Sequence, residues 1–168
     1  LWGNPLYNWD YLEKTSFKWW VDRVKSNLNL YDLIRIDHFR GFESFWAVPF
    51  GEKTAINGEW VKCPGEKLFS TLKKELESLP IIAEDLEIIT PEVESLRDTF
   101  SFPGMKILQF AFYPGQDNPY LPHNHIRNCI VYTGTHDNDT TLGWYNKLSY
   151  HDKEYIKKYL NLENDYDI

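Results

Sequence analysis

The sequence predicts an α/β fold assembled from strand–loop–helix units in series. Four short, nearly continuous apolar runs bounded by turn residues are typical of strands buried on both faces, as in a parallel sheet. Amphipathic helical patterns separate these runs. The 168 residues are 42% hydrophobic, and 17% are aromatic, so the chain has enough apolar surface for one buried core and is not a disordered segment.

Each predicted strand ends in a cluster of polar or turn-forming residues. The strands are predicted, in chain order, at residues 33–36, 80–83, 105–112 and 129–132. Short apolar runs of this kind are too brief for core helices, and their flanking Gly, Pro, Asn and Asp residues favour turns. The segment Gly41–Gly65 is rich in Gly, Pro and aromatic residues, and we expect a large loop there.

Helices are predicted between the strands, where apolar residues recur three or four positions apart. One apolar face is formed by Phe17, Trp20, Val21, Val24 and Leu28, and another by Leu68, Leu72, Leu76 and Leu79. Thr90 followed by Pro91 is typical of an N-cap and first helical position, so a helix is expected to begin there. Ser149, with Asp152 three positions later, resembles a capping box that begins a last helix.

A carboxylate follows three of the four predicted strands: Asp37, Glu84 and Asp137. In α/β folds, functional side chains gather at the carboxyl ends of parallel strands, where the loops of neighbouring units meet. Each carboxylate alone has a simpler interpretation as a helix cap or a solvated loop residue. Their occurrence at successive strand ends favours a carboxylate-based active site.

Two carboxyl groups are sufficient to cleave a glycosidic bond, if one is ionised and nucleophilic and the other carries a proton. Arg35 precedes Asp37 by two positions, so both side chains of an extended strand point to the same side. The guanidinium would favour the ionised form of Asp37. Glu84 follows four apolar residues, which would favour its protonated form.

Aromatic side chains in the predicted loops suggest a surface on which sugar rings could stack. These residues are Trp2, Trp9, Phe45, Trp46 and Trp60. The alternative is that each of them folds inward and closes its loop over the core. Phe17 and Trp20, which lie on a helical face, are assigned to the core.

Charge, cysteine and metal patterns exclude several function classes. The formal net charge is −7 and there is no basic stripe, so a nucleic-acid partner is not expected, and no apolar run is long enough to span a membrane. Cys63 and Cys129 are too far apart in sequence for a metal-type pair and are interpreted as structural thiols. His123 and His125 would lie on one face of a strand but lack a third ligand, and Asp137–Asp139 lacks the rest of a calcium loop. No metal is expected.

Nine stretches of the chain carry a specific family resemblance. Three hold the candidate carboxylates: residues 35–42 (RIDHFRGF), 82–86 (IAEDL) and 132–140 (YTGTHDNDT). Further matches are residues 3–9 (GNPLYNW), 54–58 (TAING), 60–62 (WVK), 90–93 (TPEV), 103–106 (PGMK) and 122–124 (PHN). In this order, to about Tyr145, they resemble the motifs of glycoside hydrolase family 77, the 4-α-glucanotransferases or amylomaltases.

The resemblance implies an α/β fold of the (β/α)₈ barrel type, in which the predicted strands are strands four to seven. It implies that Asp37 is the nucleophile, Glu84 the acid and base, and Asp137 the stabiliser of the transition state in a retaining reaction. Substrate-binding positions implied in the same way are Arg35, His136, Trp2 and Phe110. The family usually has Gly where this chain has Glu87.

The implied activity is transfer of α-1,4-glucan segments between maltooligosaccharides or starch-type glucans, without a cofactor. Alternatives are an α-1,4-glucan hydrolase and an inactive glucan-binding remnant. Because a complete barrel needs about 250 residues and the chain begins without Met, we expect residues 1–168 to be the central portion of one catalytic barrel domain, with N- and C-terminal parts missing. The protein is expected to be a monomer of the cytoplasm, or of a plastid in a photosynthetic eukaryote.

Overall fold

The computed structural model describes residues 4–86, 88–113 and 117–165. The chain divides into two compact units, residues 1–104 and residues 105–168. Both combine helices with strands that are hydrogen-bonded in pairs. The α/β mixture predicted from the sequence is therefore present.

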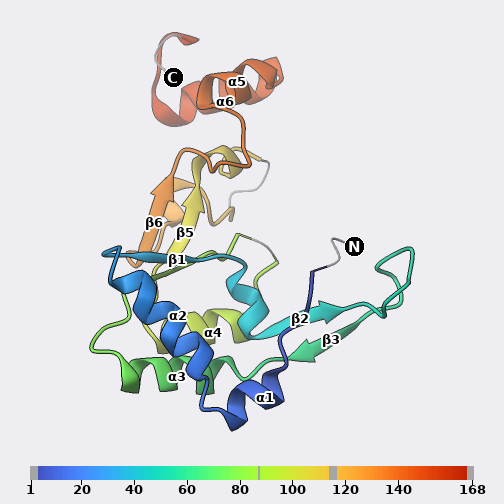
Figure 1. The fold of residues 1–168 in the computed structure, drawn as a ribbon. Helices are drawn as coiled ribbons and strands as arrows, with labels where there is room; N and C mark the ends of the chain where they lie inside the picture. Colours follow the sequence, from blue (N-terminus) through green and yellow to red (C-terminus); the bar gives the residue numbers. More distant parts are fainter. Residues whose placement is uncertain (1–3, 87, 114–116, 166–168) are drawn as a thin grey trace. The chain divides into compact units, whose positions relative to one another are not determined.

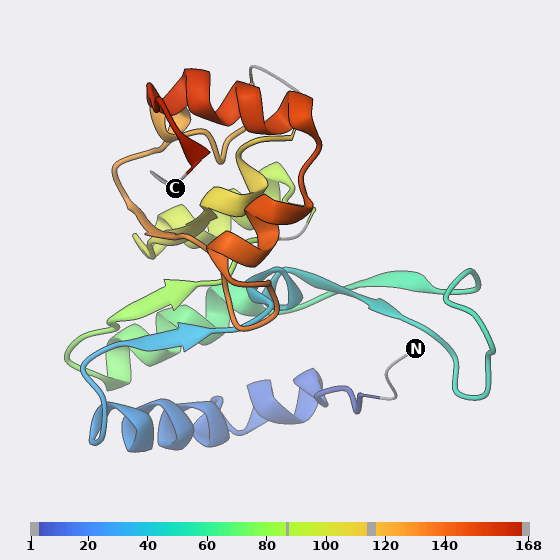
Figure 2. The same ribbon diagram turned by 90° about the horizontal axis from the view of Figure 1, so that it is seen from above.

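The first unit is built on two parallel strands with helices against them (Figure 1). Its elements, in chain order, are α1 (Trp9–Lys14), α2 (Lys18–Leu28), β1 (Ile34–Ile36), the 3₁₀ helix η1 (Phe39–Phe42), β2 (Ser44–Ala47), β3 (Glu59–Lys62), α3 (Gly65–Glu75), β4 (Ile81–Ala83) and α4 (Pro91–Thr99). Strands β1 and β4 pair in parallel, with Ile36 opposite Ala83. Figure 2 shows these two strands side by side.

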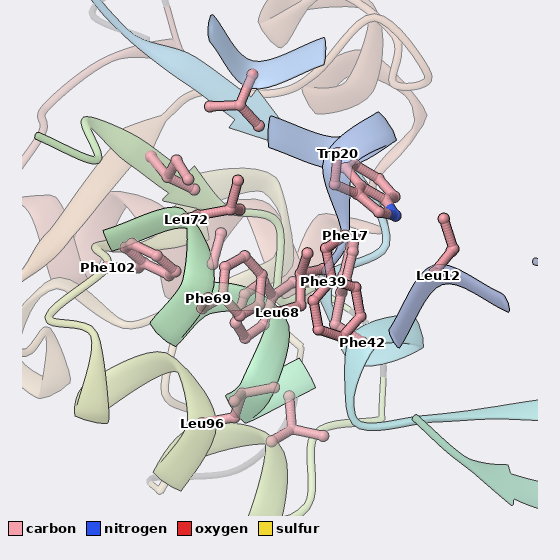
Figure 3. Close-up of a cluster of buried hydrophobic side chains, with 14 residues drawn as sticks. Leu12, Phe17, Trp20, Phe39, Phe42, Leu68, Phe69, Leu72, Leu96 and Phe102 are labelled. Atoms are coloured by element: carbon pink, nitrogen blue, oxygen red, sulfur yellow. The ribbon is translucent and has the colours of Figure 1, made fainter. Parts of the chain in front are cut away.

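The core of the first unit is a cluster of apolar side chains from its helices and strands (Figure 3). Phe69 of α3 lies at its centre, with its ring 5.6 Å from Phe39, 5.3 Å from Phe42 and 5.2 Å from Phe102. Phe17 and Trp20 are buried in the same cluster, as predicted. Because Phe39 and Phe42 belong to η1, the segment directly after β1 is anchored in the core.

The segment predicted as a large loop between Gly41 and Gly65 contains regular structure, so that prediction is wrong. It holds the end of η1 and an antiparallel hairpin of β2 and β3, in which Trp46 lies opposite Trp60. Figures 1 and 2 show the hairpin extending away from the helices of the first unit. The cross-strand aromatic pair stabilises the hairpin despite the turn-forming residues at its tip.

One helix boundary and the burial of one strand also differ from the prediction. Helix α3 ends at Glu75, and Leu76 is already extended, with ψ 142°, so the apolar spacing that continues to Leu79 does not extend the helix. Pro80 explains this in part, because a proline disfavours helical backbone in the residue before it. Strand β1 is only half-buried, whereas β4 is buried throughout, so burial on both faces is confirmed for β4 alone of this pair.

The second unit contains β5 (Gly104–Ile107), which begins at the boundary, the 3₁₀ helices η2 (Leu108–Phe110) and η3 (Pro122–Asn124), β6 (Cys129–Tyr132), α5 (Thr141–Lys147) and α6 (Tyr150–Leu160). Strands β5 and β6 are hydrogen-bonded neighbours, and their arrows run the same way in Figure 1. The strand predicted to run to Phe112 ends at Ile107, where the chain turns into η2. Ser149 caps α6 by accepting a bond from the Asp152 N–H at 3.2 Å, as predicted.

Candidate active site

Two of the three candidate carboxylates follow neighbouring parallel strands. Asp37 comes directly after β1, and Glu84 comes directly after β4. The strand pairing continues one step beyond β4, because the Glu84 N–H donates to the Ile36 carbonyl at 2.9 Å and the Phe39 N–H donates to the Glu84 carbonyl at 3.0 Å. The backbone therefore brings Asp37 and Glu84 to the same edge of the sheet, as the sequence predicted.

Asp37 lies at an exposed position beside a cation. Its side chain is 75% exposed, and its Oδ1 lies 2.5 Å from Nη2 of Arg35. The alternation of side chains along β1 places both on the same side of the strand, which confirms the predicted contact. The contact places a guanidinium against the carboxylate proposed as the nucleophile.

Glu84, in contrast, is buried, yet its carboxyl group is not surrounded by apolar atoms alone. Its Oε2 accepts from the His38 N–H at 2.7 Å, and its Oε1 accepts from the Leu86 N–H at 2.9 Å. The four apolar residues before Glu84 do not reveal these two donors, and the protonated form expected for Glu84 stays a prediction. Two backbone donors, one on each oxygen, fix the orientation of the carboxyl group.

A buried ion pair lies next to Glu84 in the sequence. Asp85 and Arg97 of α4 are both buried, with Oδ2 and Nη1 2.6 Å apart, and Arg97 also bonds the exposed Asp98 through Nε at 2.8 Å. Burial by itself would lower the pKa of Arg97, but the bonds to Asp98 and Asp85 outweigh it and raise that pKa. A Cβ on Gly104 would lie 2.3 Å from Oδ2 of Asp85, so a larger residue at this position would displace the Asp85 carboxylate.

Arg40 connects three segments around this edge. Its guanidinium carbon lies 4.1 Å from the ring centre of Trp60, and its Nη1 donates to the carbonyl of Ile88. The side chain is buried, so the cation–π contact is largely desolvated. Arg40 thereby joins the segment after Asp37, the hairpin and the segment after Glu84. The sequence predicts neither this contact nor the Asp85–Arg97 pair, since both partners are distant in the chain.

The third carboxylate, Asp137, belongs to the second unit, where it follows β6. Its side chain is 80% exposed, and its Oδ2 lies 3.4 Å from Nε2 of His136. A pocket of about 390 Å³ is lined by Phe110, Tyr113, Asp137, Asp139, Trp144 and Lys147 among others. Two of the residues predicted to bind substrate or stabilise charge, Phe110 and Asp137, are thus brought to one pocket of this unit.

The loop around Asp137 is held by its own polar side chains. Asn138 Oδ1 accepts from the N–H and the hydroxyl of Thr135, at 2.8 and 2.9 Å. The bond from Lys147, and then the bond from the Thr140 N–H, lower the pKa of Asp139. These contacts support the interpretation of Asp137–Asp139 as a loop network rather than a calcium site.

Of the aromatic residues predicted in loops, some fold inward and others are exposed, where a sugar ring could stack on them. Trp9 lies in α1 and packs against the core, with its ring 6.3 Å from that of Phe42, so it folds inward, while Phe45 is partly buried. Trp46 and Trp60 of the hairpin are 40% and 54% exposed, with ring centres 5.3 Å apart. Trp2 and Glu87 lie outside the described residues.

The histidines and cysteines of the described residues form neither a metal site nor a disulfide. The described residues hold no group of three or more His, Cys, Asp and Glu side chains that could bind a metal ion. His123 lies in η3 rather than on a strand and contacts the Tyr159 hydroxyl at 2.8 Å, while His125 contacts the Tyr120 carbonyl at 2.9 Å. Cys63 and Cys129 are free thiols.

Within the described part of the chain, every helix is too short or too polar to span a membrane.

Comparisons with known proteins agree with these features. The model of glycoside hydrolase family 77, described as 4-alpha-glucanotransferase, matches residues 1–167. The chain is 55% identical over 166 residues to the 4-alpha-glucanotransferase of Clostridium butyricum and 58% identical over 162 residues to that of Synechocystis. These matches cover 98% and 95% of this chain but 34% and 32% of the relatives, so the chain spans about a third of their length.

A solved structure is similar over the same range. It is the amylomaltase from Streptococcus agalactiae in complex with acarbose, with a TM-score of 0.93 and 44% sequence identity. The match covers 98% of this chain and 34% of that structure. The matched family model, the identity of the relatives and the likeness of this fold agree: the chain belongs to glycoside hydrolase family 77.

Proposed function

We propose that the protein of which this chain forms a part transfers α-1,4-glucan segments between glucan molecules by a retaining double displacement. The observation that carries the proposal is the placement of Asp37 and Glu84 after adjacent parallel strands, with Arg35 in contact with Asp37. A retaining enzyme needs one ionised and one proton-donating carboxyl group on either side of the bond that breaks. The 4-alpha-glucanotransferases among the relatives support the same reaction.

In the first step, a carboxylate oxygen of Asp37 attacks the anomeric carbon of the donor glucan. The bond from this carbon to the glycosidic oxygen breaks, and that oxygen takes the proton carried by Glu84. The products are a glucosyl ester of Asp37 and a shortened glucan. In the second step, Glu84 removes the proton from the 4-hydroxyl of an acceptor glucan, whose oxygen attacks the same carbon and releases Asp37.

Other residues bind the sugars in this proposal. Asp137 would hold hydroxyl groups of the distorted sugar, and His136 lies beside it to donate to the same sugar. The exposed carboxylate and the pocket that Asp137 shares with Phe110 support these roles. An aromatic ring such as Phe110 offers a face to the C–H groups of a glucose unit, and Trp2 is proposed for the same purpose.

We further propose that residues 1–168 are the central portion of one (β/α)₈ barrel. In this arrangement β1, β4, β5 and β6 are barrel strands four to seven, and each proposed catalytic residue lies at a carboxyl end, where barrel enzymes carry their active sites. Substrates would be maltooligosaccharides and starch-type glucans, acting as donors and acceptors. Two plant relatives are described as chloroplastic or amyloplastic, and we propose the cytoplasm, or the plastid in a plant, as the location of a monomeric enzyme.

The experiment is to incubate the full-length protein with maltotriose and to separate the products. Transfer predicts glucose together with a series of maltooligosaccharides longer than maltotriose. Glucose and maltose without longer products would show a hydrolase. No turnover, with binding of maltooligosaccharides retained, would show a glucan-binding remnant. Either of the last two results rejects the proposal.

A further inference from the structure

His38, the residue directly after Asp37, has a left-handed backbone. Its φ is +49° and its ψ is +54°. This conformation is sterically unfavourable for an L-residue other than glycine, and such residues gather at functional sites when the surrounding structure holds them in place. The other described non-glycine residues with positive φ are Ser16, Phe17, Ser101 and Asn161, none of which adjoins a proposed catalytic residue.

The left-handed turn directs two successive N–H groups to the same residue. The N–H of His38 donates to Oε2 of Glu84 at 2.7 Å, and the N–H of Phe39 donates to the carbonyl of Glu84 at 3.0 Å. In an extended strand, successive N–H groups point to opposite sides. A β conformation at His38 would therefore lose one of these two bonds.

The ring of His38 packs closely against Gly41. A Cβ on Gly41 would lie 2.9 Å from Cδ2 of His38, closer than atoms of this kind approach each other. Phe39, which follows His38, and Phe42, which follows Gly41, are buried in the core and fix the path of η1. The local structure therefore holds His38 in its left-handed conformation.

We propose that His38 is a positioning residue for Glu84: its left-handed backbone orients the carboxyl group that delivers a proton to the leaving glucan. The second oxygen, Oε1, is held by the Leu86 N–H at 2.9 Å. With both oxygens bonded to backbone N–H groups, the carboxyl group of Glu84 is held in one orientation. The inference rests on the proposed function, in which Glu84 is the acid.

Substrates with different leaving groups separate this role from a general effect on folding. Cleavage of maltotriose needs a proton on the departing sugar, whereas α-maltotriosyl fluoride releases fluoride, which leaves without one. The value of kcat/KM for fluoride release reports only the steps up to formation of the ester on Asp37. A residue that acts through Glu84 therefore matters for maltotriose and not for the fluoride.

The variants are made in the full-length protein. His38→Val places a β-branched residue where φ is positive, which disfavours the left-handed backbone, while His38→Asn retains it because Asn tolerates this region. Ser16→Val is the matched control, since Ser16 has φ +50° and lies outside the site. We expect His38→Val to lower kcat/KM for maltotriose by about 10- to 100-fold. A general acid contributes roughly 100- to 10,000-fold to the rate, and a misplaced Glu84 carboxyl group would lose part of that contribution. The value for the fluoride should stay within about threefold of the wild type, and His38→Asn and Ser16→Val should resemble the wild type with both substrates.

Equal losses with both substrates in His38→Val would overturn the proposal, because the residue would then act through Asp37 or the fold. Equal losses with maltotriose in His38→Val and His38→Asn would overturn it too, since the side chain rather than the backbone would be responsible. The wild-type protein distinguishes these failures from failure of the proposed function: if it elongates maltotriose, the function stands whatever the variants show.

Discussion

The carboxylate of Asp85 and the guanidinium of Arg97 lie 2.6 Å apart, and both side chains are almost completely buried. Asp85 is the residue after Glu84, and Arg97 lies in α4, so the pair joins the segment that carries the proposed acid to the helix that follows it. Removing one partner of a buried ion pair leaves the other charge without compensation.

Asp85→Asn is therefore expected to lower the free energy of unfolding of the full-length protein by about 3 kcal/mol. Chemical denaturation followed by circular dichroism measures this. Asp22→Asn is the matched control, because Asp22 bonds Lys18 at the same distance of 2.6 Å but both side chains are more than half exposed. The control should change stability by less than about 0.5 kcal/mol. If both variants lost a similar free energy of unfolding, burial would not be what makes the Asp85–Arg97 pair important for stability.

The sequence predicts those parts of the fold that depend on local pattern. Runs of apolar residues locate β1, β4 and β6, and the Ser149 cap locates α6. It does not predict the end of β5, because Leu108–Phe110 is as apolar as the strand before it. What turns the chain there is tertiary: buried Gln109 donates through Nε2 to the Asp139 carbonyl at 2.8 Å, thirty residues away.

In the candidate site, too, the sequence predicts what local pattern determines and not what tertiary contacts determine. The positions of Asp37 and Glu84 follow from strand ends, and the Arg35 contact follows from side-chain alternation. The bond from the His38 N–H to Glu84 depends on the sign of one backbone angle, and residue type does not determine that sign for histidine. The hairpin of β2 and β3 was missed because the turn-forming composition of its tip obscures two four-residue strands.

Asp37→Asn should abolish transfer in the full-length protein while its fold is retained. The amide has nearly the same shape as the carboxylate but cannot attack the anomeric carbon, so we expect turnover of maltotriose to fall by roughly 1000-fold or more. Asp32→Asn is the control, because Asp32 is an exposed carboxylate just before the same strand. It should keep wild-type turnover. Undiminished turnover in Asp37→Asn would remove Asp37 from the role of nucleophile.

Cys63 is expected to react slowly with alkylating reagents in the folded protein. Burial raises the pKa of its thiol to about 11, and the hydrogen bond with Trp9 offsets only part of this. Since the thiolate is the reactive form, only about one thiol in a thousand is reactive at pH 8. Peptide mass spectrometry after iodoacetamide treatment should show labelling at Cys63 at least about tenfold slower in buffer than in urea at the same pH. Equal rates would contradict the effect of burial.

The raised pKa also fixes the sign of a stability effect at high pH. An unfolded cysteine ionises near pH 8.5, so the unfolded state loses this proton before the folded state does. The contribution of Cys63 to stability is therefore complete below about pH 8.5 and declines as the pH rises through about 11. Cys63→Ser should remove this part of the alkaline loss of stability, and denaturation curves of both proteins between pH 8 and 11 would measure the difference.

Arg40→Lys should destabilise the protein although it preserves the charge. The guanidinium carbon of Arg40 lies 4.1 Å from the ring centre of Trp60, and the same guanidinium donates to the Ile88 carbonyl. An ammonium group cannot do both, because it lacks the planar arrangement of donors. The expected loss in free energy of unfolding is about 1–2 kcal/mol, the size of a desolvated cation–π contact.

Arg23→Lys provides the comparison, because Arg23 lies 5.3 Å from the centre of the Trp19 ring at an exposed position. Arg23→Lys should change the free energy of unfolding by no more than about 0.5 kcal/mol, because water screens an exposed contact of this kind. Urea denaturation of the full-length protein and both variants measures the two effects under one condition. If Arg40→Lys costs no more than Arg23→Lys, then Arg40 does not hold the hairpin to the segment after Glu84, and the hairpin must be held by the core contacts of η1 instead.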